Sequence, residues 1–194
     1  MAGEILVTTN QQACFSSRHL FFRPLAKQDK ALYFSLYTSK QVMRHIGPPL
    51  SREQTRQLFT FTLNNTNSDG DQRLSWTVVE RQSQKSIGML ALTWDLTRSD
   101  AASIGIMLYC DSQGKGYGLE AQGALSEYGF SHLSLNKIYT QFAVTNLVNE
   151  HIYHKLGFIT SDEKEAEISC NPLPTKSCYL DKQGWQHSFI ESCP

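Results

Sequence analysis

The feature that most constrains the fold is a glycine-rich turn at residues 113–118, which reads Gln-Gly-Lys-Gly-Tyr-Gly. A nearly continuous apolar run from Ile104 to Tyr109 precedes this turn, and a segment with helical periodicity, from Tyr117 to about His132, follows it. This order predicts a buried strand, a tight turn and the start of a helix. The backbone N–H groups at such a helix start, helped by roughly half a positive charge from the helix dipole, suit a phosphate group.

The glycine spacing narrows the kind of phosphate site. Lys115 adds a cation, and no acidic residue lies between positions 112 and 119. The P-loop pattern fails, because Tyr109 stands where its first glycine belongs and Gly116 stands where Ser or Thr is required. The dinucleotide fingerprint fails at Leu119, where its third glycine belongs. What remains is Q-x-x-G-x-G, at Gln113, Gly116 and Gly118. An ordinary strand-to-helix turn that needs positive φ would carry similar glycines.

A second motif follows at residues 145–158. Asn146 is a good N-cap and Gly157 a good residue to end a helix, so a short helix is predicted between them. The helix carries an uncharged polar ridge at positions i, i+3 and i+7, formed by Asn146, Asn149 and Tyr153. Such a ridge suits an element that faces a ligand, although a capped surface helix with a core tyrosine would show the same pattern.

The two motifs together resemble the GNAT superfamily of N-acetyltransferases. The acyl-CoA pyrophosphate loop of this superfamily reads Q-x-x-G-x-G. The motif of its matching helix corresponds in this chain to Asn146, Asn149, Tyr153 and Lys155-Leu156-Gly157-Phe158. Upstream, Phe22-Arg23-Pro24-Leu25 and the segment from Gln41 to Gly47 resemble the opening of the ribosomal-protein alanine acetyltransferase branch. The resemblance extends from about Leu20 to Ile190.

The pattern of strands and helices predicts an α/β, or α+β layered, fold. The expected order is a strand, two helices, three strands, a helix, a strand, a helix and two strands. The chain is expected to hold an arm at 1–18, either loose or forming an added edge strand, and a single acetyltransferase domain at 19–191. This order of strands and helices predicts a mixed sheet with helices on both faces, and the resemblance implies that the sheet is mostly antiparallel. It also implies that the two central strands splay apart to admit the pantetheine arm of the cofactor.

The resemblance further implies acetyl-CoA as the cosubstrate and a primary amine as the acceptor. Tyr153 and Asn149 are the expected catalytic residues, with Tyr153 supplying a proton to the leaving thiolate. Backbone N–H groups of the buried strand are suited to polarise the thioester carbonyl. The expected cofactor-binding residues are Ile106, Leu108, Gln113, Gly114, Lys115, Gly116, Tyr117, Gly118, Asn146 and Asn149.

The chain departs from the ribosomal-protein branch at the residue expected to act as the general base. That branch is expected to carry Glu where this chain has Ser103. Asp95, Glu120 and Asp111 are substitutes by position, although Glu120 in a first helical turn favours a structural role. An α-amine, whose pKa is about 8, needs a base less than a lysine amine does, whose pKa is about 10.4. This favours an α-amine, such as a peptide N-terminus, or another amine of low pKa.

Composition excludes several classes of partner. Lys plus Arg equals Asp plus Glu at 18 each, and no basic block occurs, so neither nucleic acid nor an anionic membrane is an expected partner. Five cysteines without a C-x-x-C motif predict free thiols and, with no signal peptide or membrane helix expected, a cytoplasmic protein. We expect no metal, because His151 and His154 lack further ligands. An exposed edge strand would support a homodimer.

Three alternatives and the position of the acceptor groove remain open. The scaffold could be a non-catalytic acyl-CoA binding or sensing domain, a transferase for a small-molecule amine, or a nucleotide-binding protein of another fold. A protein N-terminus, an amino acid, an aminoglycoside and a polyamine all remain open as acceptors, and strongly cationic acceptors are disfavoured because no acidic cluster marks a loop. The expected groove elements are Trp94 with Asp95, the segment from Arg44 to Pro49, and the loop before Trp185.

Overall fold

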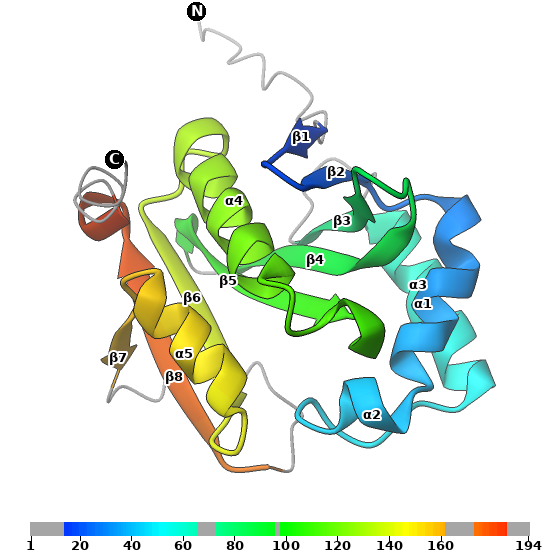
Figure 1. Cartoon of the computed structure of the whole chain (residues 1–194). Helices are drawn as coiled ribbons and strands as arrows, with labels where there is room; N and C mark the ends of the chain where they lie inside the picture. Colours follow the sequence, from blue (N-terminus) through cyan, green and yellow to red (C-terminus); the bar gives the residue numbers. More distant parts are fainter. Residues whose placement is uncertain (1–13, 66–72, 96–97, 162–172, 186–194) are drawn as a thin grey trace, which may run out of the picture.

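A computed structural model describes residues 14–65, 73–95, 98–161 and 173–185. Its eight-stranded sheet has the order β1-β2-β3-β4-β5-β6-β8-β7 (Figure 1). The strands are β1 (Phe15–Ser16), β2 (Leu20–Pro24), β3 (Arg73–Glu80), β4 (Ser86–Asp95), β5 (Arg98–Leu108), β6 (Lys137–Ala143), β7 (Ile159–Ser161) and β8 (Thr175–Asp181). Among the described strands, β5 and β6 pair in parallel and all other pairs are antiparallel. The predicted mixed, mostly antiparallel sheet is confirmed.

The helices follow the predicted order, with one addition. They are α1 (Lys30–Tyr37), α2 (Lys40–Met43), α3 (Arg52–Asn65), α4 (Tyr117–His132) and α5 (Leu147–Lys155), with 3-10 turns at Lys27–Asp29 and Cys110–Ser112. The short α2 was not predicted, and the first predicted helix is divided into a 3-10 turn and α1. The start of α3 is a capping box, in which the Gln54 N–H donates to Ser51 Oγ at 3.2 Å and the Ser51 N–H donates to Gln54 Oε1 at 2.9 Å.

Helices cover both faces of the sheet, and the alternation of side chains along the strands decides which residues each helix covers. Leu90 and Leu92 pack in the core cluster with α4 and α5, whereas Met89 packs with α1 and α3. The same alternation holds in β5, where Ile104 and Leu108 face α4. Figure 1 shows α4 and α5 in front of the sheet and α1 and α3 at one side of it.

A buried ion pair ties β2 to α1. Arg23 donates two hydrogen bonds to the Asp29 carboxylate, both at 2.7 Å, and Asp29 also accepts the Ala26 N–H at 2.9 Å. Burial alone would raise the pKa of Asp29, but these hydrogen bonds outweigh it and hold that pKa below its usual value. The carboxylate is therefore charged at neutral pH and fixes the entry into α1.

The two ends of the described chain lie at opposite edges of the sheet. β1 pairs with β2 inside the segment predicted to be an arm, so at least residues 15 and 16 join the sheet. The rest of that arm lies outside the described residues, as do residues 162–172 between β7 and β8. No helix in the described ranges is long and apolar enough to cross a bilayer. The boundary at residue 18 and the homodimer stay predictions.

Candidate functional site

The site lies where β5 and β6 separate. Their parallel pairing ends at Ser103 and Tyr139, and beyond this point β6 pairs with β8 while β5 pairs with β4. The Tyr109 N–H donates to the Ile87 carbonyl of β4 at 2.9 Å. Because peptide groups alternate in direction along a strand, those of Ile106 and Leu108 must face the opposite way, into the gap. The predicted splay is confirmed, and it leaves peptide donors and acceptors for a ligand.

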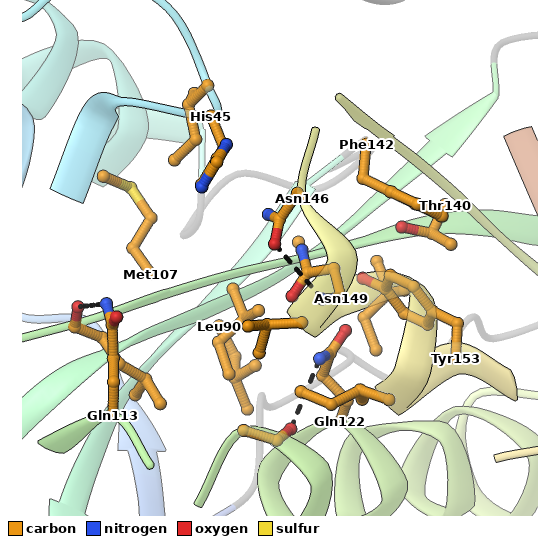
Figure 2. A pocket seen from close by; sticks show the side chains of 18 of the residues that line it. His45, Leu90, Met107, Gln113, Gln122, Thr140, Phe142, Asn146, Asn149 and Tyr153 are labelled. Atoms are coloured by element: carbon orange, nitrogen blue, oxygen red, sulfur yellow. Dashed lines mark hydrogen bonds between the residues drawn. The ribbon is translucent and has the colours of Figure 1, made fainter. Parts of the chain in front are cut away.

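A pocket of about 750 Å³ fills this gap, and residues from elements on both faces of the sheet line it. We call its two parts the α4–α5 half and the α1–α2 half. The polar residues of the α4–α5 half are Gln113, Gln122, Asn146, Asn149, His151, Tyr153 and Lys155, together with the glycines at 114, 116 and 118. The polar residues of the α1–α2 half are Tyr37, Gln41, Arg44, His45 and Arg73. Figure 2 shows His45 and Gln122 facing the pocket from opposite sides.

The glycine-rich turn lies at the N-terminus of α4. Gly114 and Gly116 have φ angles of 76° and 82°, a region that favours glycine, and Gly116 is the N-cap of α4. The first intrahelical bond runs from the Glu120 N–H to the Gly116 carbonyl, so the preceding amides have no partner within the helix. The turn thus directs N–H groups and the positive end of a helix dipole at the pocket, as a phosphate requires.

The side chains of this turn divide between the pocket and the surface. Gln113 Nε2 donates to the Leu108 carbonyl at 3.3 Å, which links the turn to the open edge of β5 (Figure 2). Lys115 and Tyr117 are not among the lining residues. The Tyr117 hydroxyl instead donates to Glu80 Oε1 on β3 at 2.5 Å. Any contact of Lys115 or Tyr117 with a ligand would therefore come from the backbone of these residues or from side chains at the rim of the pocket.

Helix α5 brings three predicted residues to the pocket. Asn146 Oδ1 accepts the Asn149 N–H at 3.2 Å, which is the expected N-cap. Asn146, Asn149 and Tyr153 all line the pocket. The Tyr153 side chain is buried, with its ring 5.4 Å from that of Phe142. Burial strongly raises the pKa of Tyr153, and a hydrogen bond with Thr140 opposes this only in part. The phenol therefore stays protonated throughout the neutral range.

The predicted substitutes for the general base lie elsewhere. Glu120 accepts hydrogen bonds from Ser17 Oγ at 2.7 Å and from the His19 N–H at 2.6 Å, so it ties α4 to the segment between β1 and β2. This geometry agrees with the structural role that its place in the first turn of the helix favoured for Glu120. Asp111 is exposed, and neither it nor Ser103 lines the pocket. The side chain of Asp95 lies outside the described residues.

Sequence reasoning missed Gln122, a fully buried polar residue on α4. Its Nε2 donates to the Gly118 carbonyl at 3.3 Å, while its Oε1 has no hydrogen-bond partner among the described residues. Figure 2 shows the carboxamide directed into the pocket, towards α5. A buried oxygen without a partner costs about 1–3 kcal/mol. A ligand N–H in the pocket would satisfy it. The available signal was its position one helical turn after Gly118.

Sequence reasoning also missed the role of His45. The residue follows α2 and lines the pocket, with its Nδ1 3.3 Å from Thr145 Oγ1. Burial, and then the charge of Arg44, lower the pKa of His45, so it is neutral at pH 7. Arg44, His45 and Ile46 come from the predicted groove segment. Trp94 and Trp185 do not line the pocket, and Trp185 Nε1 instead donates to Glu127 Oε2 on α4 at 2.6 Å.

Within the described ranges, no group of three or more His, Cys, Asp or Glu side chains is placed to hold a metal ion. His154 is exposed on α5, and Cys14, Cys110 and Cys178 are free thiols.

Comparison with known proteins identifies relatives of this arrangement. Residues 19–159 match the family model described as an acetyltransferase (GNAT) domain. The chain is 30% identical over 94 residues to spermidine N(1)-acetyltransferase from Vibrio cholerae, a match that spans 48% of this chain and 54% of that protein. The chain thus matches about half the length of this curated relative.

Solved structures share the fold. An acetyltransferase (GNAT family) from Bacillus anthracis has a TM-score of 0.72 at 17% identity, covering 88% of this chain and 99% of that chain. The Vibrio cholerae spermidine N-acetyltransferase in complex with CoA and spermine has a TM-score of 0.72 at 22% identity, covering 87% and 98%.

Proposed function

Because this chain belongs to the GNAT family of acetyltransferases, we propose that it transfers the acetyl group of acetyl-CoA directly to a primary amine. The observation that carries this proposal is the splay of β5 from β6 beside the glycine-rich start of α4. The gap leaves the peptide groups of Ile106 and Leu108 to a ligand, and the helix start suits its phosphates.

The residues of the α4–α5 half fit acetyl-CoA. The turn from Gln113 to Gly118 would hold the pyrophosphate through backbone N–H groups. The peptide groups of Ile106 and Leu108 would pair with the pantetheine amides, and Gln122 Oε1 would accept one of their N–H groups. Asn146 and Asn149 would complete the polar wall opposite the turn. Acetyl-CoA supplies the activated acetyl group and a thiolate leaving group.

Tyr153 is the proposed hydrogen-bond donor to that thiolate. A free tyrosine has a pKa of about 10 and a thiol one of about 8.5, so proton transfer between them is mildly uphill. Burial raises the pKa of Tyr153 further and makes full transfer less favourable. Tyr153 therefore acts mainly by holding a hydrogen bond on the sulfur as negative charge develops. Asn149, one turn earlier on α5, is the proposed second catalytic residue and contacts both cofactor and reacting centre.

His45 is the proposed acceptor of the amine proton. In the tautomer whose Nδ1–H donates to Thr145 Oγ1, Nε2 of the neutral imidazole is the acceptor and would take the proton. In the reaction a C–N bond forms, the C–S bond breaks, and the proton of the attacking amine moves to His45. The lowered pKa of His45 makes it a weak base, which favours an acceptor amine of low pKa over a lysine side chain.

The acceptor could be a small molecule or a peptide N-terminus, and membership of the ribosomal-protein branch stays a prediction. The relatives named for spermidine support a small-molecule amine. A pocket of about 750 Å³ has the size of a small-molecule site and must hold the pantetheine arm as well. We therefore propose a small primary amine as the acceptor.

Two measurements test this function. Thermal-shift titrations with acetyl-CoA, ATP and NAD should show stabilisation by acetyl-CoA at the lowest concentration, because a ligand at 100 times its dissociation constant adds about 2.7 kcal/mol. Thiol release from acetyl-CoA should then depend on added amine. Binding of acetyl-CoA without amine-dependent thiol release, across a broad panel of amines, would instead indicate an acyl-CoA sensor.

A further inference from the structure

The pocket has an unbalanced charge. Five of its lining residues are Arg, Lys or His, and among the residues whose side chains the structure describes, no Asp or Glu lines it. His151 and Lys155 belong to the α4–α5 half, where the phosphates of acetyl-CoA would balance them. Arg44, Arg73 and His45 belong to the α1–α2 half. The cofactor does not account for the two guanidinium charges of this second half.

The position of Arg73 follows from the alternation of β3. Leu74 packs in the core cluster with α4, so the preceding residue points to the opposite face, towards α1. Burial raises the pKa of Tyr33 on α1, and the charge of Arg73 opposes this rise only slightly, which shows that Arg73 lies near that phenol. Arg73 Nε interacts with Ser75 Oγ at 3.4 Å. This arginine therefore lies on the α1 face of the sheet.

Arg44 reaches the same half from the segment after α2. The side chain is exposed, and its charge lowers the pKa of the neighbouring His45. None of the ion pairs found among the described residues involves Arg44 or Arg73. Two guanidinium groups without a carboxylate partner in the described part of the chain thus line the side from which an acceptor would approach.

We infer that the acceptor is a small primary amine that also carries a carboxylate, such as an amino acid, an inference that rests on the proposed function. Guanidinium groups bind carboxylates through paired, charge-assisted hydrogen bonds. A carboxylate bound at Arg44 or Arg73 would orient the amine towards the thioester and His45. The same charges would repel a polyamine, because its additional ammonium groups would approach the two arginines. The acceptor class of this chain therefore differs from that named for its Vibrio cholerae relatives.

Matched acceptors separate these possibilities. Amine-dependent thiol release should be compared for alanine against alaninamide, and for 4-aminobutyrate against butylamine and 1,4-diaminobutane. We expect kcat/KM, expressed per unprotonated amine, to be at least about tenfold higher for the carboxylate of each set, a difference of ~1.4 kcal/mol. A tetrapeptide with acidic residues after its N-terminus is the last acceptor to be compared. A higher kcat/KM for this peptide than for every amino acid would overturn the inference in favour of an acidic peptide N-terminus.

Charge reversal tests the two arginines directly. Arg44→Glu and Arg73→Glu should each remove the preference for the carboxylate acceptor while leaving the dissociation constant of acetyl-CoA unchanged. Arg52→Glu, on the exposed first turn of α3 and outside the pocket, makes the same change in net charge and should retain the preference. Calorimetric titration with N-acetylalanine should show weaker binding to the two pocket variants, which is a readout independent of turnover.

The outcomes distinguish this inference from the function on which it rests. Turnover with butylamine or 1,4-diaminobutane that equals or exceeds turnover with 4-aminobutyrate would overturn the carboxylate acceptor and leave acetyl transfer intact. Thiol release with none of the amines, despite tight acetyl-CoA binding, would overturn the proposed function itself.

Discussion

His45 and Thr145 meet across the pocket, with the imidazole Nδ1 3.3 Å from the threonine hydroxyl, although 100 residues separate them in sequence. His45 comes from the segment after α2, and Thr145 directly precedes the N-cap of α5. The contact therefore joins the two halves of the pocket and fixes the imidazole beside the site at which the acceptor amine would react.

The acid side of the pH profile tests the role of His45. If neutral His45 accepts the amine proton, activity should fall as pH decreases through a pKa below the usual value of about 6.5, since burial and Arg44 both disfavour the imidazolium. Arg44→Gln should move this limb of kcat/KM to higher pH by removing one positive charge. His45→Gln should abolish the limb.

His154→Asn, on the exposed side of α5, is the matched control and should leave the limb in place. An unchanged acid limb in His45→Gln would remove His45 from the proton-accepting role. Changes in activity on the alkaline side of the pH profile instead reflect deprotonation of the acceptor amine, because the pKa of that amine is about 8 or more.

Tyr153→Phe should lower kcat by at least about a hundredfold, the scale of a lost acid or hydrogen-bond donor. The ring would keep its packing against Phe142, so the dissociation constant of acetyl-CoA should change little. Stopped assays of thiol release and calorimetric binding separate the two effects. Tyr179→Phe on β8, outside the pocket, provides the control. A wild-type kcat in Tyr153→Phe would exclude the proposed role.

Gln122→Leu should change stability and cofactor binding in opposite senses. The substitution removes a buried oxygen without a partner, so the free energy of unfolding should stay level or rise, by up to about 1 kcal/mol. Binding of acetyl-CoA should weaken by roughly fivefold, equivalent to one lost hydrogen bond of about 1 kcal/mol. Chemical denaturation and calorimetry measure the two quantities.

Ser126→Ala is the matched control for Gln122→Leu. Ser126 lies one turn further along α4 and also has a buried oxygen without a partner among the described residues, but it does not line the pocket. We expect a change in stability without a change in acetyl-CoA affinity. Equal affinity in Gln122→Leu and the wild type would show that this oxygen makes no contact with the cofactor.

Arg23→Met should destabilise the fold by about 3 kcal/mol at pH 7, because it leaves the buried Asp29 carboxylate without its cation. In the wild type the pKa of Asp29 is lowered, so its contribution to stability is present above the unfolded pKa of about 3.9 and is lost as pH falls through the folded value. In the variant the carboxyl can become protonated more readily. The difference in unfolding free energy should therefore shrink as pH falls.

Denaturation at pH 7 and near pH 4 checks this prediction. The double variant Arg23→Met/Asp29→Asn should recover part of the loss, because it removes the unpaired charge. A penalty that stays constant with pH would show that Arg23 acts through packing of its aliphatic chain rather than through Asp29.

The sequence by itself determined the parts of the site that contiguous residues build. The glycines at 114 and 116 have positive φ, the turn precedes a helix, and Asn146 caps α5, all as their local patterns predict. These features follow from backbone sterics and unsatisfied helix ends, which act within a few residues. The mixed sheet was predictable for the same reason, since hydrophobic periodicity is a local signal.

Only the tertiary structure decided which distant side chains share the pocket. His45 follows α2, Arg73 opens β3 and Gln122 lies on α4, and no short-range pattern shows that these three side chains share one pocket. Glu120 was a substitute for the base by position, although its place in a first helical turn favoured a structural role, and its partners on the segment between β1 and β2 agree with that structural role. The direction of a side chain, its burial and its charge partners are fixed by packing between elements far apart in sequence, and these decide its chemistry.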